Sequence, residues 1–419
     1  MSWIRSNSSL AEVGNHWKRT ATSVTPMAIT MPIATSCTIP LRTCSSLLQR
    51  RGYRAYEPQL PRRPLVPRIA KLTIALLGFV LTAGILAGAV LDGAEHADPE
   101  ARAAAPKPTR PAGKPVVLAF GGDVHFESNI RAELRAGPSV VLASIGPVLR
   151  RADLAVVNLE TAVTDGGTPA PKEFVFRSPA SAFAALAAGG VDVASMANNH
   201  GMDYGEQGLR DSLRAARRSR FPVIGIGLDD AQAYRPYRAT LNGRRIAVIG
   251  ATQVLDDHLI SAWTAGPRKP GLASAKDVPR LVRSVREARA TADTVVVFLH
   301  WGIELQACPS PDQRRLARQL VAAGADVIVG GHAHRLQGAG RMGKALVAYG
   351  LGNFVWYGTS ELSTRTGVLL VTMDGRRVLG YRWEPARIVD GTPRPLGGAE
   401  RRSSVSSWHS LRGCTGLRR

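Results

Sequence analysis

Cysteine is scarce in this chain, which contains four cysteines among 419 residues. Cys37 and Cys44 stand in an N-terminal tail, Cys414 stands near the C-terminus, and only Cys308 falls within the stretch that carries the motifs described below. Small secreted domains that depend on disulfides are much denser in cysteine. We therefore expect no disulfide framework in the domain.

Acidic residues and aromatics are also few. The sequence has 32 Asp and Glu against 54 Lys and Arg, which gives a formal net charge of +22. The excess lies mainly in the tails: residues 1–71 carry eleven basic and two acidic residues, and residues 376–419 carry ten basic and three acidic residues. Nucleic-acid grooves combine basic residues with aromatic stacking platforms, and aromatics make up only 6% of this chain. We expect no nucleic-acid partner.

One long apolar run is present. Residues 72–91 are twenty residues without a charge, long enough to cross a bilayer core of about 30 Å as a helix. Four basic residues in 62–71 precede the run and four acidic residues in 92–100 follow it. The positive-inside rule then places the N-terminus in the cytoplasm and the following domain outside. We predict a transmembrane helix over 69–91, a single-pass plasma-membrane protein, and a Pro/Ala-rich linker over 92–114.

A cleaved signal peptide is the alternative, which would make the protein secreted. Small residues at 101–105 offer a cleavage site, but they lie about ten residues past the apolar run, farther than signal peptidase prefers. Residues 1–68 form a basic tail without periodicity and are expected to be disordered. A later start of translation, at Leu65 or Val66, is a hypothesis that N-terminal sequencing tests. Residues 391–419 are rich in Gly, Ser and Arg and are also expected to be disordered.

The segment 115–390 is expected to form a single α/β domain. Apolar runs predict strands at 116–120, 153–158, 191–196, 222–226, 245–251, 293–299, 325–330, 345–350, 366–373 and 378–388. Helical patterns lie at about 138–151, 179–188, 205–219, 276–290 and 310–323. Strands alternating with helices give the α/β class, and the crowding of strands late in the chain indicates a second, partly antiparallel sheet.

Polar motifs recur at the ends of the predicted strands. They are Asp123 and His125 in GGDVH, Glu160 in VVNLE, Asn199 and His200 in ANNHG, His300 in FLHWG, and His332 and His334 in GGHAH. A single such residue is ordinarily a helix cap or a hydrogen-bonded core histidine. Five motifs together favour a ligand site, because open α/β sheets bind ligands beyond the carboxyl ends of their strands. Two divalent ions need about seven nitrogen and oxygen ligands with a bridging carboxylate, and this set supplies them.

The sequence from about 116 to 390 resembles the CapA family of bacterial capsule (poly-γ-glutamate) synthesis proteins. The matching text is LAFGGDVHFE, ADLAVVNLETAVT, FVFRSP, MANNHGMDYGEQGL, FLHWGIE, AAGADVIVGGHAHRLQG and YGLGNFVW. The family's domain is similar to the calcineurin-like metallophosphoesterases, which implies a four-layer α/β/β/α sandwich with metals at the loop edge between two sheets. Many family members carry Met or Leu where this chain has His125, so metal binding is expected more strongly here.

The resemblance also implies roles for the motif residues. One ion would take Asp123, His125 and His334, the other would take Asn199, His300 and His332, and Glu160 would bridge them. This mixed nitrogen and oxygen shell suits Mn, Fe or Zn better than Mg or Ca. His200, next to a ligand in the chain, would protonate a leaving group, and its alternative role is a structural histidine beside the metals.

Four further residues are candidates for substrate contact. Arg177 in FRSP offers a guanidinium to a carboxylate or phosphate, although such an arginine is more often simply solvated. Glu304 would bind an ammonium group or a neighbouring ligand, Trp301 would wall the cleft, and Asn353 in GLGNF would face the site.

The predicted function is metal-assisted attack of hydroxide on a γ-glutamyl amide or a phosphoester in a cell-envelope polymer. The predicted partners are that polymer, for which the family suggests poly-γ-glutamate, the membrane, and other capsule synthesis subunits. Two alternatives stay open. An envelope phosphoesterase would use the same metals, and a non-catalytic component of capsule assembly or export would use the fold as a scaffold.

The topology can be tested on spheroplasts. If residues 69–91 anchor the protein with its domain outside, added protease should degrade the domain, and the intact protein should pellet with membranes. A soluble product that begins near Ala104 would instead reveal a cleaved signal peptide. Protection of the domain in intact spheroplasts would contradict the orientation.

Overall fold

A computed structural model describes residues 113–419. The predicted basic tail (1–68), the predicted transmembrane helix (69–91) and nearly all of the linker (92–114) lie outside the described residues. Within residues 113–419, no helix has the length and apolar composition needed to cross a membrane.

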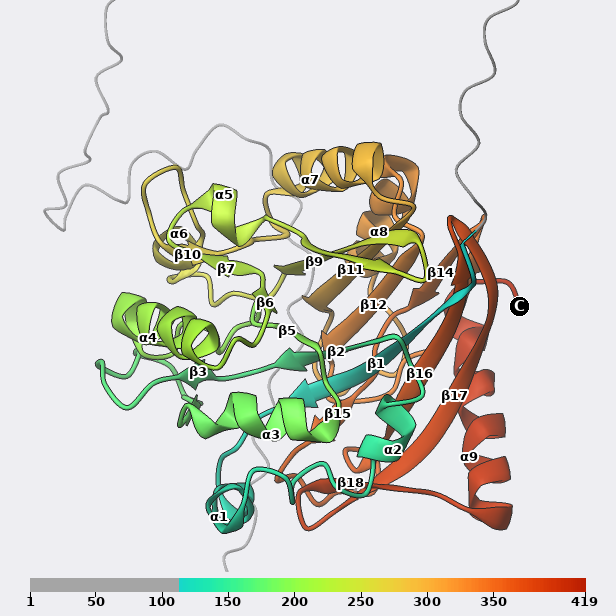
Figure 1. Cartoon of the computed structure of the whole chain (residues 1–419), viewed down its shortest axis with the longest axis horizontal. Helices are drawn as coiled ribbons and strands as arrows, with labels where there is room; N and C mark the ends of the chain where they lie inside the picture. Colours follow the sequence, from blue (N-terminus) through green and yellow to red (C-terminus); the bar gives the residue numbers. More distant parts are fainter. Residues whose placement is uncertain (1–112) are drawn as a thin grey trace, which may run out of the picture. The chain divides into compact units, whose positions relative to one another are not determined.

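The described chain forms two large mixed sheets (Figure 1). The first contains, in spatial order, β18 (Thr392–Pro395), β17 (Arg377–Val389), β16 (Arg365–Asp374), β1 (Val116–Val124), β2 (Leu154–Leu159), β5 (Val193–Ser195) and β6 (Val223–Ile224), with β15 (Asn353–Val355) beside β1. Strands β15, β1, β2, β5 and β6 run parallel, whereas β16, β17 and β18 pair antiparallel with their neighbours.

The second sheet contains β13 (Ala339–Met342), β14 (Ala345–Ala348), β12 (Val327–His332), β11 (Thr294–Trp301), β9 (Arg244–Thr252) and β8 (Tyr237–Leu241). Its four central strands are parallel, and the edge strands β13 and β8 are antiparallel. Two small pairs, β3 (Ala162–Val163) with β4 (Arg177–Ser178) and β7 (Ile226–Gly227) with β10 (Gly271–Leu272), complete the strands described here.

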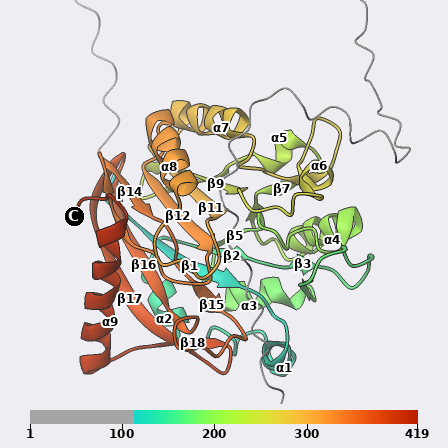
Figure 2. The same cartoon turned by 180° about the vertical axis from the view of Figure 1, so that it is seen from behind.

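The side-chain alternation of the strands builds a layered core. Phe120 of β1 and Phe298 of β11 belong to one buried cluster between the two sheets. Their neighbour Ala119 points the other way, into a cluster with Leu186, and Val297 likewise joins a cluster with Leu281. Because successive strand residues face opposite sides, each central strand packs against the other sheet and against helices. Helices therefore cover the outer face of each sheet, as Figures 1 and 2 show.

The helices on the two outer faces are α3 (Ser181–Gly189) and α4 (Gly205–Arg218) on the first sheet, and α7 (Val278–Thr291) and α8 (Pro311–Ala323) on the second. All four confirm helices expected from periodicity. Helix α8 has a capping box, because the Ser310 side chain accepts from the backbone N–H of Gln313 while the Gln313 side chain accepts from that of Ser310. Short helices α1 (Asn129–Ala136), α5 (Asp230–Ala233) and α6 (Ile260–Trp263) lie in the connections.

The prediction of a helix over 138–151 is mostly wrong. The segment forms successive turns, and only α2 (Gly146–Leu149) is helical. Proline lacks the N–H that a helix interior needs and disfavours helical backbone in the residue before it, so Pro147 permits a helix to begin there but not to pass through.

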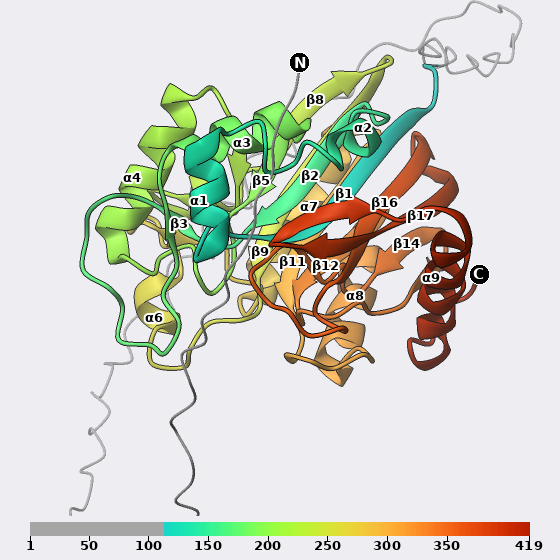
Figure 3. The same cartoon turned by 90° about the horizontal axis from the view of Figure 1, so that it is seen from below.

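The C-terminal segment 391–419 is ordered, contrary to the expectation drawn from its composition. It adds β18 to the first sheet and then forms α9 (Gly398–Ser410) and a 3-10 turn, η1 (Leu411–Cys414). Helix α9 lies beside β17 (Figure 3). Trp408 of α9 is 1% exposed and stacks on Trp383 of β17, with ring centroids 5.0 Å apart. Burying one large aromatic side chain outweighs the weak helix preference of the surrounding serines.

A disulfide joins Cys308 to Cys414, which corrects the expectation that the domain has none. It links the loop after β11 to η1, across 106 residues of sequence. The domain therefore extends to the C-terminus instead of ending at 390.

This disulfide should stabilise the protein mainly by restricting the unfolded chain, so Cys414→Ser should lower the free energy of unfolding by about 2–4 kcal/mol. Urea unfolding measures the loss. Cys308→Ser should cost the same, and the double variant should cost no more than either single change, because all three remove one bond. Additive losses would mean that the two cysteines stabilise the fold independently.

Candidate metal centre

The polar motifs meet where the parallel strands of the two sheets end. Asp123 lies opposite Asn158 in the pairing of β1 with β2, and Glu160 directly follows β2. His300 and His332 lie at the ends of β11 and β12 in the other sheet. The backbone N–H of His332 donates to a carboxylate oxygen of Asp123 at 2.9 Å, so the two sheets are joined at this point.

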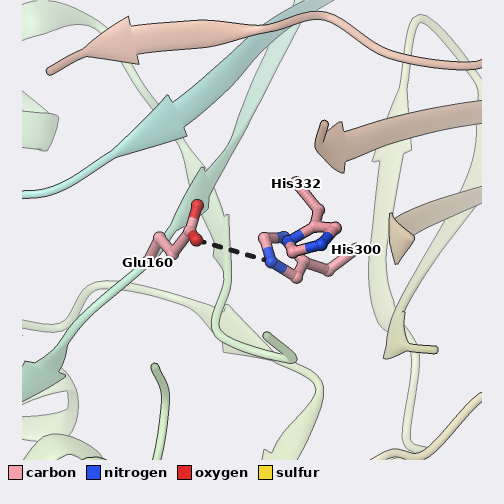
Figure 4. Close-up of side chains that lie close together, drawn as sticks. All are labelled: Glu160, His300 and His332. Carbon is pink, nitrogen blue, oxygen red and sulfur yellow. Dashed lines mark ion pairs between the residues drawn. The ribbon is translucent and has the colours of Figure 1, made fainter. Parts of the chain in front are cut away.

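Two groups of possible metal ligands share one residue. Glu160, His300 and His332 offer ligand atoms that all lie within 4.8 Å of one another, and so do Asp123, Glu160 and His334. Figure 4 shows Glu160 approaching from the first sheet and the two imidazoles from the second, with 3.5 Å between Glu160 Oε1 and His300 Nε2. Glu160 therefore occupies the position of a bridge between the two groups.

Unpaired atoms at this point fit a cation. Glu160 Oε1, His332 Nδ1 and His125 Nε2 are buried and have no hydrogen-bond partner. Buried polar atoms in proteins are almost always paired, and each unpaired one costs about 1–3 kcal/mol. Glu160 Oε1 offers lone pairs to a divalent ion, and His332 Nδ1 does so in the tautomer protonated at Nε2. His125 Nδ1 accepts from the Glu127 backbone N–H at 3.0 Å, so its Nε2 carries the proton in the neutral ring and would bind a metal only in the other tautomer.

Burial shifts the ionisation of every group in the centre. It raises the pKa of Asp123 to about 7 and that of Glu160 well above its usual range, where the charge of Asp123 raises it further. Burial lowers the pKa of His332 to about 3 and that of His334 to about 4. The imidazoles are thus neutral, which is the form that coordinates metals, and a nearby cation would return the carboxylates to their ionised form.

Asn158 connects the ligands, and sequence reasoning missed it. Its amide donates to Asp123 Oδ1 at 2.8 Å and to Glu160 Oε2 at 3.3 Å, and lies 3.1 Å from His300 Nδ1. Asn198 in turn donates to the Asn158 carbonyl at 3.0 Å. A polar residue in the middle of the apolar run of β2 was the available signal, since a buried amide needs partners.

Asn199 and His200 follow β5 and approach the same centre. Asn199 Oδ1 lies 2.7 Å from His300 Nε2, and His200 Nε2 lies 3.9 Å from Glu160 Oε1. The other nitrogen of His200, Nδ1, lies 2.6 Å from Asp203 Oδ2. An ionised Asp203 accepts a hydrogen bond from the Nδ1–H of His200. The other ring nitrogen, Nε2, then faces the ligands with its lone pair free.

Asp203 is held by Lys172, a residue that sequence reasoning also missed. The Lys172 side chain is 6% exposed, lies 3.0 Å from Asp203 Oδ1 and donates to the Asn199 carbonyl oxygen. Burial raises the pKa of Asp203 to about 7, and the lysine charge opposes that rise. The two residues lie far apart in the sequence, and only the folding of the loop between β3 and β4 brings Lys172 close to Asp203 and His200. Their spacing in the sequence therefore does not reveal the contact.

His125 lies in an aromatic wall beside the ligands. Its ring stacks on Phe176 with centroids 5.0 Å apart and meets the edge of Trp356 at 4.2 Å. Phe176 also stacks on His200 at 4.0 Å. Among the described residues, His125 joins neither of the two ligand groups that share Glu160, so its role as a ligand stays a prediction.

The predicted substrate residues separate into two kinds. Glu304 is exposed and forms a further possible ligand group with His332 and His334. Asn353 Oδ1 lies 2.8 Å from His334 Nδ1, and its amide donates to the Ser363 carbonyl at 3.0 Å. Both therefore lie at the centre, where Asn353 fixes the orientation of a histidine.

The other two, Trp301 and Arg177, make different contacts. Trp301 is fully buried in the core behind the second sheet and donates from Nε1 to the Tyr349 carbonyl at 2.7 Å, so the expectation that it walls the cleft is wrong. A strand residue next to His300 necessarily faces the opposite side of the sheet. Arg177 is exposed over the ring of Tyr204, 5.1 Å from its centroid.

The GGHAH segment has a constrained backbone. His332 and His334 have φ of 86° and 51°, in the left-handed region that non-glycine residues rarely adopt. A Cβ on Gly331 would meet Asp123 Oδ1 at 2.1 Å, so glycine is required for the carboxylate to approach. Such strain persists at sites where the surroundings fix the geometry.

Residues 117–357 match the family described as bacterial capsule synthesis protein PGA_cap, which is more than half of the chain. The chain belongs to this family, and the resemblance seen in the sequence is confirmed.

Among curated relatives, the PGA biosynthesis protein CapA of Bacillus subtilis (strain 168) is 31% identical over 286 residues, covering 66% of this chain and 73% of that protein. The capsule biosynthesis protein CapA of Bacillus anthracis is 29% identical over 294 residues, covering 67% and 69%.

Solved structures resemble the fold at low identity. A hypothetical protein from Thermus thermophilus has a TM-score of 0.43 and 17% identity, covering 65% of this chain and 100% of that one. The 5'-nucleotidase from Candida albicans SC5314 has a TM-score of 0.40 and 9% identity, covering 71% and 57%.

Measurement of the metal content tests whether Glu160 is a ligand shared by two ions. The purified protein, reconstituted with Mn, Fe or Zn, should hold about two ions per chain by elemental analysis. Glu160→Ala should lose both, whereas Asp123→Ala should lose one more readily than the other, because Glu160 alone belongs to both groups. Glu206→Ala, an exposed helix position, serves as the control. A wild-type protein without bound metal would refute the site.

Proposed function

We propose that this chain is a metal-dependent hydrolase that acts on an envelope polymer during capsule or poly-γ-glutamate biosynthesis. The observation that carries the proposal is Glu160: it is buried, its Oε1 has no hydrogen-bond partner, and it belongs to two groups that also contain neutral histidines and Asp123. A merely structural role would leave those lone pairs unused at a cost in stability.

The ligand residues fit two divalent ions such as Mn, Fe or Zn. Asp123, Glu160 and His334 would hold one, and Glu160, His300 and His332 the other, with Asn199 beside His300 and with His125 as a further predicted ligand. When bound, such ions polarise the scissile group and lower the pKa of water, which makes hydrolysis feasible near neutral pH.

The chain's own residues would handle the proton. His200 presents Nε2 toward the centre, while Asp203 accepts from Nδ1 and Lys172 holds Asp203 in place. A proton that Nε2 takes from the attacking water would make His200 an imidazolium, which Asp203 would stabilise. Donation of that proton to the leaving nitrogen of an amide, or the leaving oxygen of a phosphoester, completes cleavage and returns His200 to neutrality.

The proposed place of action is outside the plasma membrane, with the protein anchored by residues 69–91. The Cys308–Cys414 disulfide supports this placement, because such bonds persist in oxidising compartments and are rare in the cytosol. The names of the relatives, which refer to PGA and capsule biosynthesis, support a capsule polymer as the substrate. Other capsule synthesis proteins are the proposed partners.

Substitution of His200 separates hydrolysis from a scaffold role. His200→Ala should keep its metals while hydrolysis of poly-γ-glutamate, or of the envelope polymer cleaved by the wild type, falls about two to four orders of magnitude. Mass spectrometry of the products identifies the bond that is cut. His258→Ala changes an exposed histidine that belongs to none of the possible ligand groups, and it should behave as wild type.

Two results would contradict the proposal. Loss of metal in His200→Ala would make His200 a ligand. Normal capsule formation in cells that carry a metal-loaded His200→Ala variant would favour a non-catalytic component of assembly.

A further inference from the structure

A cavity of about 140 Å³ lies between α9 and the end of the first sheet. Arginines from three segments line it, namely Arg335 after β12, Arg365 at the start of β16 and Arg387 in β17. Serines 403, 404 and 407 of α9 add hydroxyls. The volume corresponds to a few water molecules, which suits one acidic side group rather than a whole polymer chain.

The cavity adjoins the metal centre through two chain segments. Arg335 directly follows His334, and its Nη1 donates to the Leu305 carbonyl at 2.9 Å, one residue after Glu304. On the other side, the segment that leads to Arg365 contains Ser363, whose carbonyl accepts from Asn353. Two lining residues, Arg335 and Leu362, are therefore direct chain neighbours of His334 and of Ser363.

The lining carries an excess of positive charge. Three guanidiniums face one carboxylate, Glu400. Arg387 lies 3.2 Å from Glu400, and Arg365 lies 2.5 Å from Glu361, in pairs whose members are 32–70% exposed. Exposed ion pairs contribute about 0–1 kcal/mol, so an incoming anion can replace them at little cost. Guanidinium forks bind carboxylates with two parallel hydrogen bonds.

Apolar side chains also line the cavity. They are Leu336, Leu362, Leu396 and Trp408, the last of which is 1% exposed. A ligand that matches both the arginines and these side chains combines carboxylates with short methylene stems. The buried Trp408 ring leaves no open face for stacking a base, so the chemistry does not suit a nucleic acid.

We propose that this cavity is a subsite for the carboxylates of an acidic polymer, poly-γ-glutamate being the polymer of matching chemistry, and that it holds the chain beside the metal centre. This subsite deepens the proposed function and rests on it for the identity of the polymer. Most of its lining, from Leu362 to Leu411, lies beyond the residues 117–357 that match the family. The C-terminal segment would thus add substrate selection to the shared centre.

Binding of a labelled γ-linked decaglutamate to the full-length protein tests the subsite, measured by fluorescence anisotropy without added metal. The double variant Arg365→Gln/Arg387→Gln should bind about tenfold or more weakly, because two charge-assisted contacts are lost. The control variant Arg377→Gln/Arg402→Gln likewise removes two positive charges, from exposed arginines outside the lining, and it should bind within about twofold of wild type.

A second variant, Glu400→Gln, distinguishes a loss of arginine contacts from a loss of folding. It breaks the same Arg387–Glu400 pair as the double variant but leaves the arginine free, so it should bind the oligomer more tightly than wild type. Weaker binding by Glu400→Gln would overturn the subsite, and so would an equal loss of binding in the control variant Arg377→Gln/Arg402→Gln. Equal competition by inorganic phosphate at the same charge concentration would show an anion site without preference for the polymer, and would also overturn the proposal.

The two proposals fail in different ways. Hydrolysis that depends on His200, with oligomer binding unchanged in Arg365→Gln/Arg387→Gln, would leave the hydrolase intact and remove the subsite. Oligomer binding that depends on these arginines, with no hydrolysis by the metal-loaded wild type, would remove the hydrolase and leave a polymer-binding protein.

Discussion

Two carboxylates, Asp123 and Glu160, lie fully buried at the ends of neighbouring parallel strands, and the surrounding structure depends on how their charge is accommodated. Two unpaired negative charges so close together are too costly to bury, and the raised pKa of each reflects that cost. The Asn158 amide and the His332 backbone N–H offset part of it. The remaining lone pairs, with four nearby neutral imidazoles, make a site that divalent cations stabilise.

The two-sheet architecture is what allows such a site. Parallel strands end at one edge, so β1 and β2 deliver carboxylates while β11 and β12 deliver histidines from the facing sheet. Neither sheet alone supplies both carboxylates and imidazoles to the two groups that share Glu160. The same packing places Phe120 and Phe298 between the sheets, so the apolar core fixes the distance across which the ligands meet. The packing that stabilises the core therefore also sets the spacing of the possible ligands.

The sequence predicted the centre better than its surroundings, for a physical reason. Asp123, Glu160 and His332 are polar residues at the ends of apolar runs, and such positions can be recognised without knowing the fold. Lys172 pairs with Asp203, and Arg365 lies opposite Arg387 in the pairing of β16 with β17, but these contacts depend on how loops and sheets pack. The ordered C-terminal helix was missed because one buried residue, Trp408, outweighs a composition that otherwise resembles a disordered tail. Trp301 was misplaced because strand alternation, rather than proximity to His300, decides which way it faces.

The central claim is that Glu160 joins two metal ions. Anomalous diffraction from crystals of the protein loaded with manganese or zinc tests it most directly, because the scattering locates each ion and its ligands without reference to activity. The account predicts two ions a few ångströms apart, with Glu160 contacting both and with His300 and His334 on different ions. A single ion, or two ions with Glu160 bound to only one of them, would contradict it.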